Sequence, residues 1–204
     1  RKYKTPDGTL YPSVTTVLSI LGRDSIEAWR KRVGEEEANK ISYRASTRGT
    51  AVHSIIEQYV KNNPDYRKGF MPNVIQSFLA VKDILDTRMG KIYGQEFALY
   101  SDYLKLAGRV DCVGEFDGVM SIIDYKTSTK PKKEAWISNY YIQEAAYAIM
   151  WEERTGIPIT QLVTIIAVDN APAQVFIEHR DNWAPQLLDT IEMYNQEHCI
   201  NTNS

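Results

Sequence analysis

Two aspartates and a lysine near the middle of the chain have the residue types and the spacing to bind a cation. They lie in residues 108–128, GRVDCVGEFDGVMSIIDYKTS, where two apolar runs meet at Asp117-Gly118. An Asp-Gly pair between apolar runs is typical of the two-residue type I′ turn of a β-hairpin. With that turn, Asp111 lies directly opposite Asp124, with Cβ atoms about 4.5 to 5.5 Å apart. A turn of three residues would instead separate the two carboxylates.

Like charges at directly opposed positions destabilise a sheet, so this pair needs a compensating positive charge. Three sources fit: a proton shared by the two carboxyl groups, Lys126 and Arg109 on the same face, or a divalent cation. Lys126 alone neutralises only one charge. A hard cation fits best, because carboxylate oxygens suit Mg²⁺ or Mn²⁺, and Mg²⁺ is usually held by carboxylates, waters and substrate phosphate. The residues therefore indicate phosphodiester hydrolysis, in which Lys126 orients the nucleophile or offsets charge on phosphorus.

The composition is typical of one compact unit. The 204 residues are 43% hydrophobic and 25% charged, which suffices for a single core. Cys112 and Cys199 cannot form a disulfide framework, and with three scattered histidines they argue against zinc and iron–sulfur chemistry. A net charge of −2 argues against a wholly basic surface but leaves room for a local basic channel. Without a membrane span or a signal-peptide segment in this sequence, we expect a soluble protein inside a cell.

The hydrophobic periodicity changes near residue 90. Before that point, helices are predicted at about 13–21, 24–41 (capped by Asp24 or Ser25), 47–62 and 74–89. After it come three strands with short turns, a long helix, two more strands and a final helix, at about 92–102, 103–114, 119–126, 133–156, 161–169, 174–180 and 182–197. This order predicts an α/β fold with a central mixed sheet flanked by helices, and a helical N-terminal portion packed over it.

Four short motifs occur in a fixed order along the chain. They are His53 in RGTAVH, G-x-x-D ending at Asp111, D-x-K ending at Lys126, and Q-x-x-x-Y ending at Tyr147. Together they resemble the PD-(D/E)-x-K nuclease superfamily, specifically its RecB-like exonuclease branch. With PSVTTVL and DYKTSTKPK, the chain most resembles the mitochondrial genome maintenance exonuclease type and its phage and bacterial relatives, over about residues 11–194. Val110 replaces the proline of the superfamily's name and the second acid is Asp rather than Glu, but neither change removes a ligand oxygen.

The resemblance implies roles for the residues of the central motifs. Asp111, Asp124 and Lys126 would be the catalytic residues. The metal ligands would be His53, Asp111, Asp124 and the backbone carbonyl of Tyr125. Mg²⁺ or Mn²⁺ would be the cofactor.

The residues around these motifs have less specific signals. Gln143 and Tyr147 lie one helical turn apart, so their shared face would point at the hairpin and contact the carboxylates or a DNA phosphate. His53 without the other motifs would be a structural histidine beside Glu57. Glu96 could position a water or a second metal, although an exposed strand glutamate is the simpler interpretation.

Substrate binding is expected from basic and aromatic residues near the hairpin. Lys130, Lys132 and Lys133 follow the catalytic strand and could form a phosphate track, and Arg48 could meet phosphate beside the His53 helix. One or two aromatic residues of the next helix could stack on bases, with core packing the simpler use of Tyr140; the three candidates are Trp136, Tyr140 and Tyr141. In relatives, the helical N-terminal portion covers a passage for single-stranded DNA.

The expected protein is therefore one nuclease domain, residues 1–204. Residues of about 1–90 form its helical N-terminal portion, and about 91–204 form a restriction-endonuclease-like core. We expect a monomeric, metal-dependent exonuclease that prefers single-stranded DNA in DNA processing, recombination or repair. We expect it in the cytoplasm or nucleoid, or in the host cytoplasm if a phage encodes it, without membrane association. The alternatives are a structure-specific or restriction-like endonuclease of the same superfamily, and a non-catalytic nucleic-acid-binding module.

Overall fold

The computed structural model describes residues 1–198, so Cys199 lies outside the described part. A five-stranded sheet forms its centre, in the order β3 (Met89–Ser101), β4 (Leu106–Phe116), β5 (Val119–Ser128), β6 (Gln161–Val168) and β7 (Gln174–His179). Neighbouring strands are antiparallel except β5 and β6, which are parallel. The helix α5 (Ser138–Thr155) makes the crossover that this parallel pair requires. The predicted mixed sheet is confirmed.

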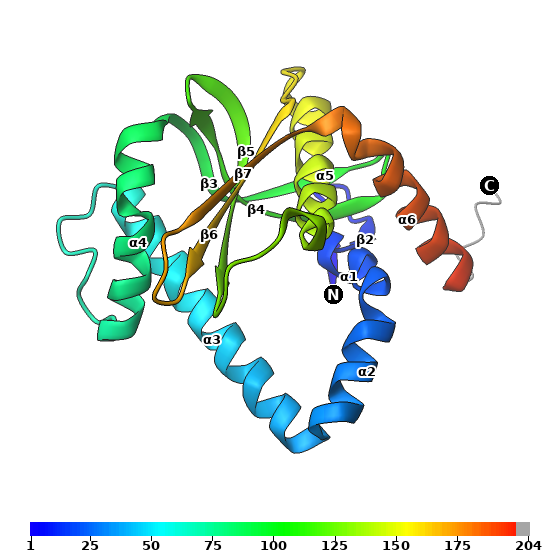
Figure 1. Ribbon diagram of the computed structural model, residues 1–204. Helices are drawn as coiled ribbons and strands as arrows, with labels where there is room; N and C mark the ends of the chain where they lie inside the picture. Colours follow the sequence, from blue (N-terminus) through cyan, green and yellow to red (C-terminus); the bar gives the residue numbers. More distant parts are fainter. Residues whose placement is uncertain (199–204) are drawn as a thin grey trace.

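Helices cover both faces of the sheet, and each face has its own apolar core (Figure 1). On one face pack α5, α1 (Val14–Leu18) and α6 (Ala184–Glu197). On the other face pack the C-terminal half of α3 (Glu35–Val60) and α4 (Pro72–Arg88). None of the helices in the described part is long and apolar enough to cross a membrane.

The turn between β4 and β5 has the predicted two-residue form. Asp117 and Gly118 have φ angles of 52° and 77°, and both positive values are what a type I′ turn requires. Phe116 therefore pairs with Val119, and this register continues along the hairpin. Arg88 also binds the Asp117 carboxylate through two hydrogen bonds of 2.9 and 2.6 Å, which ties the turn to the end of α4.

The N-terminal portion differs from the prediction in three ways. The break between its second and third helices falls at Gly34, whose φ of 88° ends α2 (Arg23–Val33), and α3 then runs unbroken for 26 residues. Asp24 and Ser25 are not the cap of α2, because Gly22 occupies that position. A small antiparallel hairpin of β1 (Lys2–Lys4) and β2 (Leu10–Pro12) was also not predicted, since three-residue strands carry almost no periodic signal.

Residues 23–47 of α2 and α3 form a V that projects from the rest of the molecule, here called the α2–α3 arch (Figure 1). All side chains of residues 39–47 are exposed, and α2 has no buried residue. The elbow of the arch is fixed by Arg30, which donates to the Glu35 carboxylate at 2.6 and 3.1 Å and also to Asn39. At its base, Arg23 binds Glu197 of α6.

Replacing Gly118 with alanine should lower the free energy of unfolding by about 1 kcal/mol, because a side chain disfavours positive φ. A Cβ at this glycine would meet no atom within 4 Å, so the loss reports the backbone alone. Urea denaturation measures it. The matched control is Gly49→Ala in the interior of α3, which should raise stability by about 0.5 to 1 kcal/mol. A similar change in both variants would contradict this account of the turn.

Candidate active site

The two aspartates lie where β4 and β5 stop pairing. Regular pairing between these strands reaches Cys112 opposite Ile123, so the next opposed positions are Asp111 and Asp124. Beyond this point the backbone N–H of Tyr125 donates to Asp111 Oδ2 at 2.9 Å. The Asp111 carboxylate thus accepts the hydrogen bond that a strand carbonyl would accept in a regular ladder. Both acids lie together at the point where the two strands separate.

Lys126 lies beside the second aspartate. Its Nζ is 2.9 Å from Asp124 Oδ2, and Asp124 is only 3% exposed. The same Nζ lies 4.9 Å from the centre of the Tyr140 ring and donates to Gln143 Oε1 at 3.2 Å. Burial disfavours the charged amine, but the charges of Asp124 and Asp111 outweigh it and raise the Lys126 pKa. The lysine is therefore a fixed cation pointing at the carboxylates.

One lysine does not neutralise both acids. Burial, reinforced by the charge of Asp124, raises the pKa of Asp111 well above its usual value. Burial also opposes ionisation of Asp124, but Lys126 and a hydrogen bond with Asp111 prevail and lower the Asp124 pKa. Of the two carboxyl groups, Asp111 is therefore the one that keeps its proton to higher pH.

Arg109 does not serve the pair. Its side chain is 58% exposed and its Nε lies 3.0 Å from Glu96 Oε2, on the opposite edge of β4 from β5. The expectation that Arg109 helps to neutralise the two aspartates is wrong, because the strands separate before Arg109 can face Lys126.

His53 reaches the same point from α3. Its helix packs on the sheet through Val52, Ile55 and Ile56, which are buried, and this contact presents the imidazole to the strand ends. His53 Nε2 lies 2.5 Å from the carbonyl oxygen of Tyr125, and Nδ1 lies 3.5 Å from Asp111 Oδ1. The structure thus brings the four expected metal ligands together, from α3 and from the hairpin of β4 and β5 that lies far from it in sequence.

Glu96 is a further member of the cluster. Gln95 pairs with Cys112 and Phe97 with Val110, so Glu96 lies opposite Asp111 across β3 and β4. Its side chain is 21% exposed, so the interpretation as an exposed strand residue is wrong. His53, Glu96 and Asp111 each offer a ligand atom within 4.8 Å of the others, a spacing that fits one cation. The connection of four residues between Ser101 and Leu106 fixes this register. Its length in the sequence could therefore have predicted that Glu96 lies opposite Asp111.

The Q-x-x-x-Y residues face the hairpin from α5, as their spacing predicts. Gln143 accepts from Lys126 and donates to the hydroxyl of Tyr147 at 3.3 Å. The Tyr147 ring lies directly on Gly108, where a Cβ would come within 2.9 Å of ring carbon Cε1. This close approach explains the glycine of G-x-x-D. Tyr147 is 3% exposed, so its side chain supports the catalytic strands from within the protein.

A buried glutamate next to this motif was missed by the sequence analysis. Glu144 is fully buried and both of its carboxyl oxygens lie within 2.9 Å of Thr164 Oγ1. Thr164 pairs with Asp124 across β5 and β6. Burial, and then the charge of Asp124, raise the Glu144 pKa well above its usual value, so the protonated form of this acid is favoured beside the site. A single acid in an apolar helix face has no pattern that marks it in sequence.

The expected phosphate track lies on the segment between β5 and α5. Gln174 fixes its backbone by accepting from the Lys132 N–H at 2.8 Å and donating to the Lys132 carbonyl at 2.9 Å. Lys130 and Lys133 are exposed, and Lys133 Nζ lies 5.1 Å from the ring centre of Trp136, which is 63% exposed.

The other two aromatic candidates of this region lie inside the protein. Tyr141 is buried in the core, with its hydroxyl donating to Glu134, so it cannot stack on a base. Tyr140 is only partly buried, but its ring is occupied by Lys126. Trp136 is thus the most exposed of the three, with the exposed Lys133 beside its ring.

Arg48 lies apart from the cluster. Its guanidinium donates to Asp169 at 2.6 Å and to Ser77 at 3.1 Å, which joins α3 to the end of β6 and to α4. Since both contacts lie within the protein, the structure gives Arg48 a role in anchoring α3.

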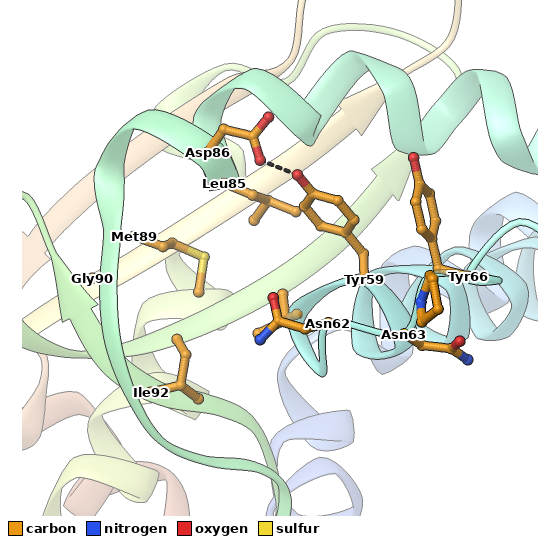
Figure 2. Close-up of a pocket in the computed structure, with 11 residues that line it drawn as sticks. Tyr59, Asn62, Asn63, Tyr66, Leu85, Asp86, Met89, Gly90 and Ile92 are labelled. Atoms are coloured by element: carbon orange, nitrogen blue, oxygen red, sulfur yellow. Dashed lines mark hydrogen bonds between the residues drawn. The ribbon is translucent and has the colours of Figure 1, made fainter.

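A cavity of about 610 Å³ lies elsewhere, between the ends of α3 and α4 and the start of β3 (Figure 2). Its lining is partly aromatic and partly amide, and Tyr59 closes one side through a hydrogen bond to Asp86. None of the expected site residues lines it. The candidate site is therefore the carboxylate cluster at the strand ends and not this cavity.

Comparison with known proteins agrees with the geometry. The family model of the PD-(D/E)XK nuclease superfamily matches residues 71–199. Mitochondrial genome maintenance exonuclease 1 of Mus musculus is 28% identical over 91% of this chain and 59% of its own length. The Xenopus tropicalis protein of that name is 25% identical over 86% of this chain and 53% of its own. The chain thus spans between half and three fifths of the length of these relatives.

A solved structure shows the same fold. A crystal structure from Eubacterium rectale, provisionally described as an exonuclease, superposes with a TM-score of 0.50 at 18% identity, covering 75% of this chain and 66% of that one. The superfamily model spans all five strands of the sheet, and with them both aspartates, the lysine and the Q-x-x-x-Y helix. This chain belongs to the PD-(D/E)XK nuclease superfamily.

Proposed function

We propose that this chain is a Mg²⁺- or Mn²⁺-dependent exonuclease that degrades single-stranded DNA in DNA processing. The observation that carries the proposal is the buried pair of Asp111 and Asp124, which has a single lysine beside it and a histidine at its edge. Members of the superfamily use divalent metals, and the names of the relatives describe exonucleases.

The donor set fits a hard divalent cation. Asp111, Asp124, His53 and the carbonyl of Tyr125 converge, and the excess of carboxylate over lysine leaves one negative charge for a cation to balance. A bound Mg²⁺ or Mn²⁺ would lower the pKa of a water and polarise the phosphate. Carboxylate-rich sites with one imidazole suit Mg²⁺ and Mn²⁺ better than softer metals.

Lys126 performs the protein's own part of the reaction. Its ammonium is held by Asp124 and Gln143, so it stays oriented before the substrate arrives. We infer that it stabilises the negative charge that develops on the phosphate and orients the attacking water. Gln143 also donates to the hydroxyl of Tyr147, whose ring packs on Gly108 of β4. Packing in the core therefore fixes the position of the Lys126 amine.

The α2–α3 arch supports a substrate with a free end. Its exposed residues 39–47 continue along α3 into the helical turns that carry His53 (Figure 1), so a strand that lies along them would arrive at the carboxylates. Lys130, Lys133 and Trp136 lie on the segment that follows the catalytic strand and offer contacts for phosphate and base. We infer that the passage admits one strand and that entry from a free end makes the enzyme an exonuclease.

Replacing Lys126 with alanine should reduce cleavage of an end-labelled single-stranded oligonucleotide by about 100-fold or more, because a fixed charge at the developing phosphate is lost. Cleavage by the wild type should stop in EDTA and return with Mg²⁺ or Mn²⁺. Lys68→Ala, on an exposed loop, is the control and should keep full activity. Full activity of the Lys126 variant, or cleavage that persists in EDTA, would refute the mechanism.

Replacing Asp111 with asparagine should remove activity but raise stability in EDTA. The raised pKa means that the native Asp111 carboxyl favours its proton, so its contribution to stability is present at low pH and is lost as the pH rises through the folded-state pKa. Asparagine does not ionise, so the variant does not lose this stability as the pH rises. Thermal or urea unfolding should show a gain of about 1 kcal/mol at pH 8 that shrinks towards pH 4. A gain that is equal at both pH values would contradict the assigned shift.

Blocking both ends of a single-stranded oligonucleotide with biotin–streptavidin should prevent cleavage, because the strand must enter the arch by an end. A covalently closed single-stranded circle should resist for the same reason. The unblocked oligonucleotide and an oligonucleotide with biotin alone are the controls. Rapid cutting of the circle would instead indicate an endonuclease of the same superfamily, and binding without any cleavage would indicate a non-catalytic module.

A further inference from the structure

A cavity between the sheet and the N-terminal hairpin lies outside the carboxylate cluster. Its volume is about 410 Å³, within the range of pockets that hold small molecules. From the sheet it is lined by residues 98–100 of β3 and 107–108 of β4, and from the hairpin by residues 3–6. None of the expected metal ligands lines it.

The pairing of β3 with β4 relates this cavity to the site. Ala98 pairs with Arg109, and Tyr100 pairs with Ala107. Side chains along a strand return to the same face at every second position, so Asp111, Arg109 and Ala107 share one face of the sheet. Directly opposed residues share a face as well, which adds Ala98 and Tyr100. The four residues from Asp111 to Ala107 span about 13 Å.

Arg109 lies on this face between the carboxylates and the cavity. Its side chain is 58% exposed, and its ion pair with Glu96 is at the surface, where such pairs contribute little to stability. The guanidinium can therefore exchange this partner for a phosphate of a bound strand. A strand whose scissile phosphate lies at Asp111 would pass Arg109 on its way to the cavity.

The lining of the cavity suits a nucleobase. Ala98 and Ala107 present only methyl groups from the sheet, and Tyr3 and Tyr100 contribute aromatic rings. Surfaces of this kind bind the face of any base by stacking, which is how single strands are held without sequence preference. The guanidinium of Arg154 also lies 4.1 Å from the centre of the Tyr100 ring, so positive charge stands against this wall.

The hairpin adds further positive charge. Lys4 lines the cavity and is exposed, and Lys2 is exposed on the same face of β1. A base inside a strand has a phosphate on each side, so its site needs cations beside an apolar pocket. Lys4 on the hairpin and Arg109 on the sheet supply these cations.

Internal hydrogen bonds hold the hairpin wall in place. Thr5 is buried; its N–H donates to the Thr9 carbonyl at 2.8 Å, and its hydroxyl donates to Asp7. The hydroxyl of Tyr11 donates to Asp102 at 2.7 Å, which ties the hairpin to the turn between β3 and β4. A wall that is already ordered loses little conformational freedom when a ligand binds.

We propose that this cavity is a subsite for one base of the substrate strand. Tyr3 and Tyr100 contact the base, and Lys4 and Arg109 contact the phosphates beside it. The subsite accepts any base, because its walls are aromatic and apolar and do not form a set of fixed hydrogen-bond donors. The inference rests on the proposed function and names the part of the protein that holds the strand beyond the cleaved bond.

Filling the cavity is the first test. Ala98 is exposed on the edge strand β3, so Ala98→Phe places a ring in the cavity and leaves both cores intact. The dissociation constant for a fluorescein-labelled single-stranded oligothymidylate, measured by anisotropy in EDTA, should rise about 5- to 100-fold. Ile177→Phe, at an exposed position of the other edge strand, is the matched control and should bind like the wild type.

Removing one ring and restoring it is the second test. Tyr3→Ala should weaken binding of the same oligonucleotide about 5-fold or more, whereas Tyr3→Phe should bind like the wild type because stacking does not need the hydroxyl. Melting temperatures show whether each variant is folded. If Tyr3→Ala loses the hairpin, Ala98→Phe decides, since it leaves the hairpin sequence unchanged.

An abasic scan then locates the base that occupies the subsite. One abasic residue is moved stepwise along the oligonucleotide from each end, and cleavage of the first bond is followed with Mg²⁺ or Mn²⁺ at enzyme concentrations below saturation. At one position near the cleaved end, the missing base should slow the wild type about 5-fold or more. The same substrate should cause no further loss in Ala98→Phe, because the two changes remove one interaction.

Two results would overturn the inference. The first is wild-type affinity in both Ala98→Phe and Tyr3→Ala. The second is an abasic scan with equal losses in the wild type and in Ala98→Phe, because the base would then be bound elsewhere. If the wild type itself neither binds nor cleaves single-stranded DNA, the proposed function fails, and this result is distinct from both.

Discussion

The repulsion between Asp111 and Asp124 is the constraint on which the rest of the site depends. The type I′ turn places the two acids opposite each other, and the surrounding apolar residues bury them. The ladder ends at that position, and the Tyr125 N–H donates to a carboxylate. Lys126 of β5 lies beside the pair and donates to Gln143 of α5, which in turn donates to Tyr147 of the same helix. Burying two neighbouring carboxylates lowers stability. A fold that nevertheless keeps both of them retains a binding place for a cation.

Glycine and tyrosine act as one unit in this arrangement. Tyr147 can approach the strand only because Gly108 has no side chain, and its hydroxyl then accepts from Gln143, which in turn accepts from Lys126. Residues almost forty positions apart therefore control one amine. Short motifs that appear independent along the sequence are thus parts of one packing contact, and this explains why the family pattern joins a glycine, a lysine and an aromatic residue.

The sequence predicted the parts of the structure that depend on local rules. The Asp117-Gly118 turn, the strand order through β5 and the facing of Gln143 toward the hairpin follow from turn chemistry and periodicity. It failed where a contact between distant segments decides the outcome. Arg109 turns to Glu96 because the strands separate, Arg48 binds Asp169, and burial raises the pKa of Glu144. None of these contacts leaves a periodic pattern in one chain.

The α2–α3 arch adds a different property. Because most of its side chains are exposed, the arch contributes little to the free energy that holds the sheet, and it depends on the Arg30 elbow and the Arg23 contact at its base. Insertions or deletions in residues 23–47 would leave both cores intact. The length and path of the arch can therefore diverge between relatives faster than the carboxylate cluster, because changes in residues 23–47 and changes at the strand ends fall in separate stretches of the gene.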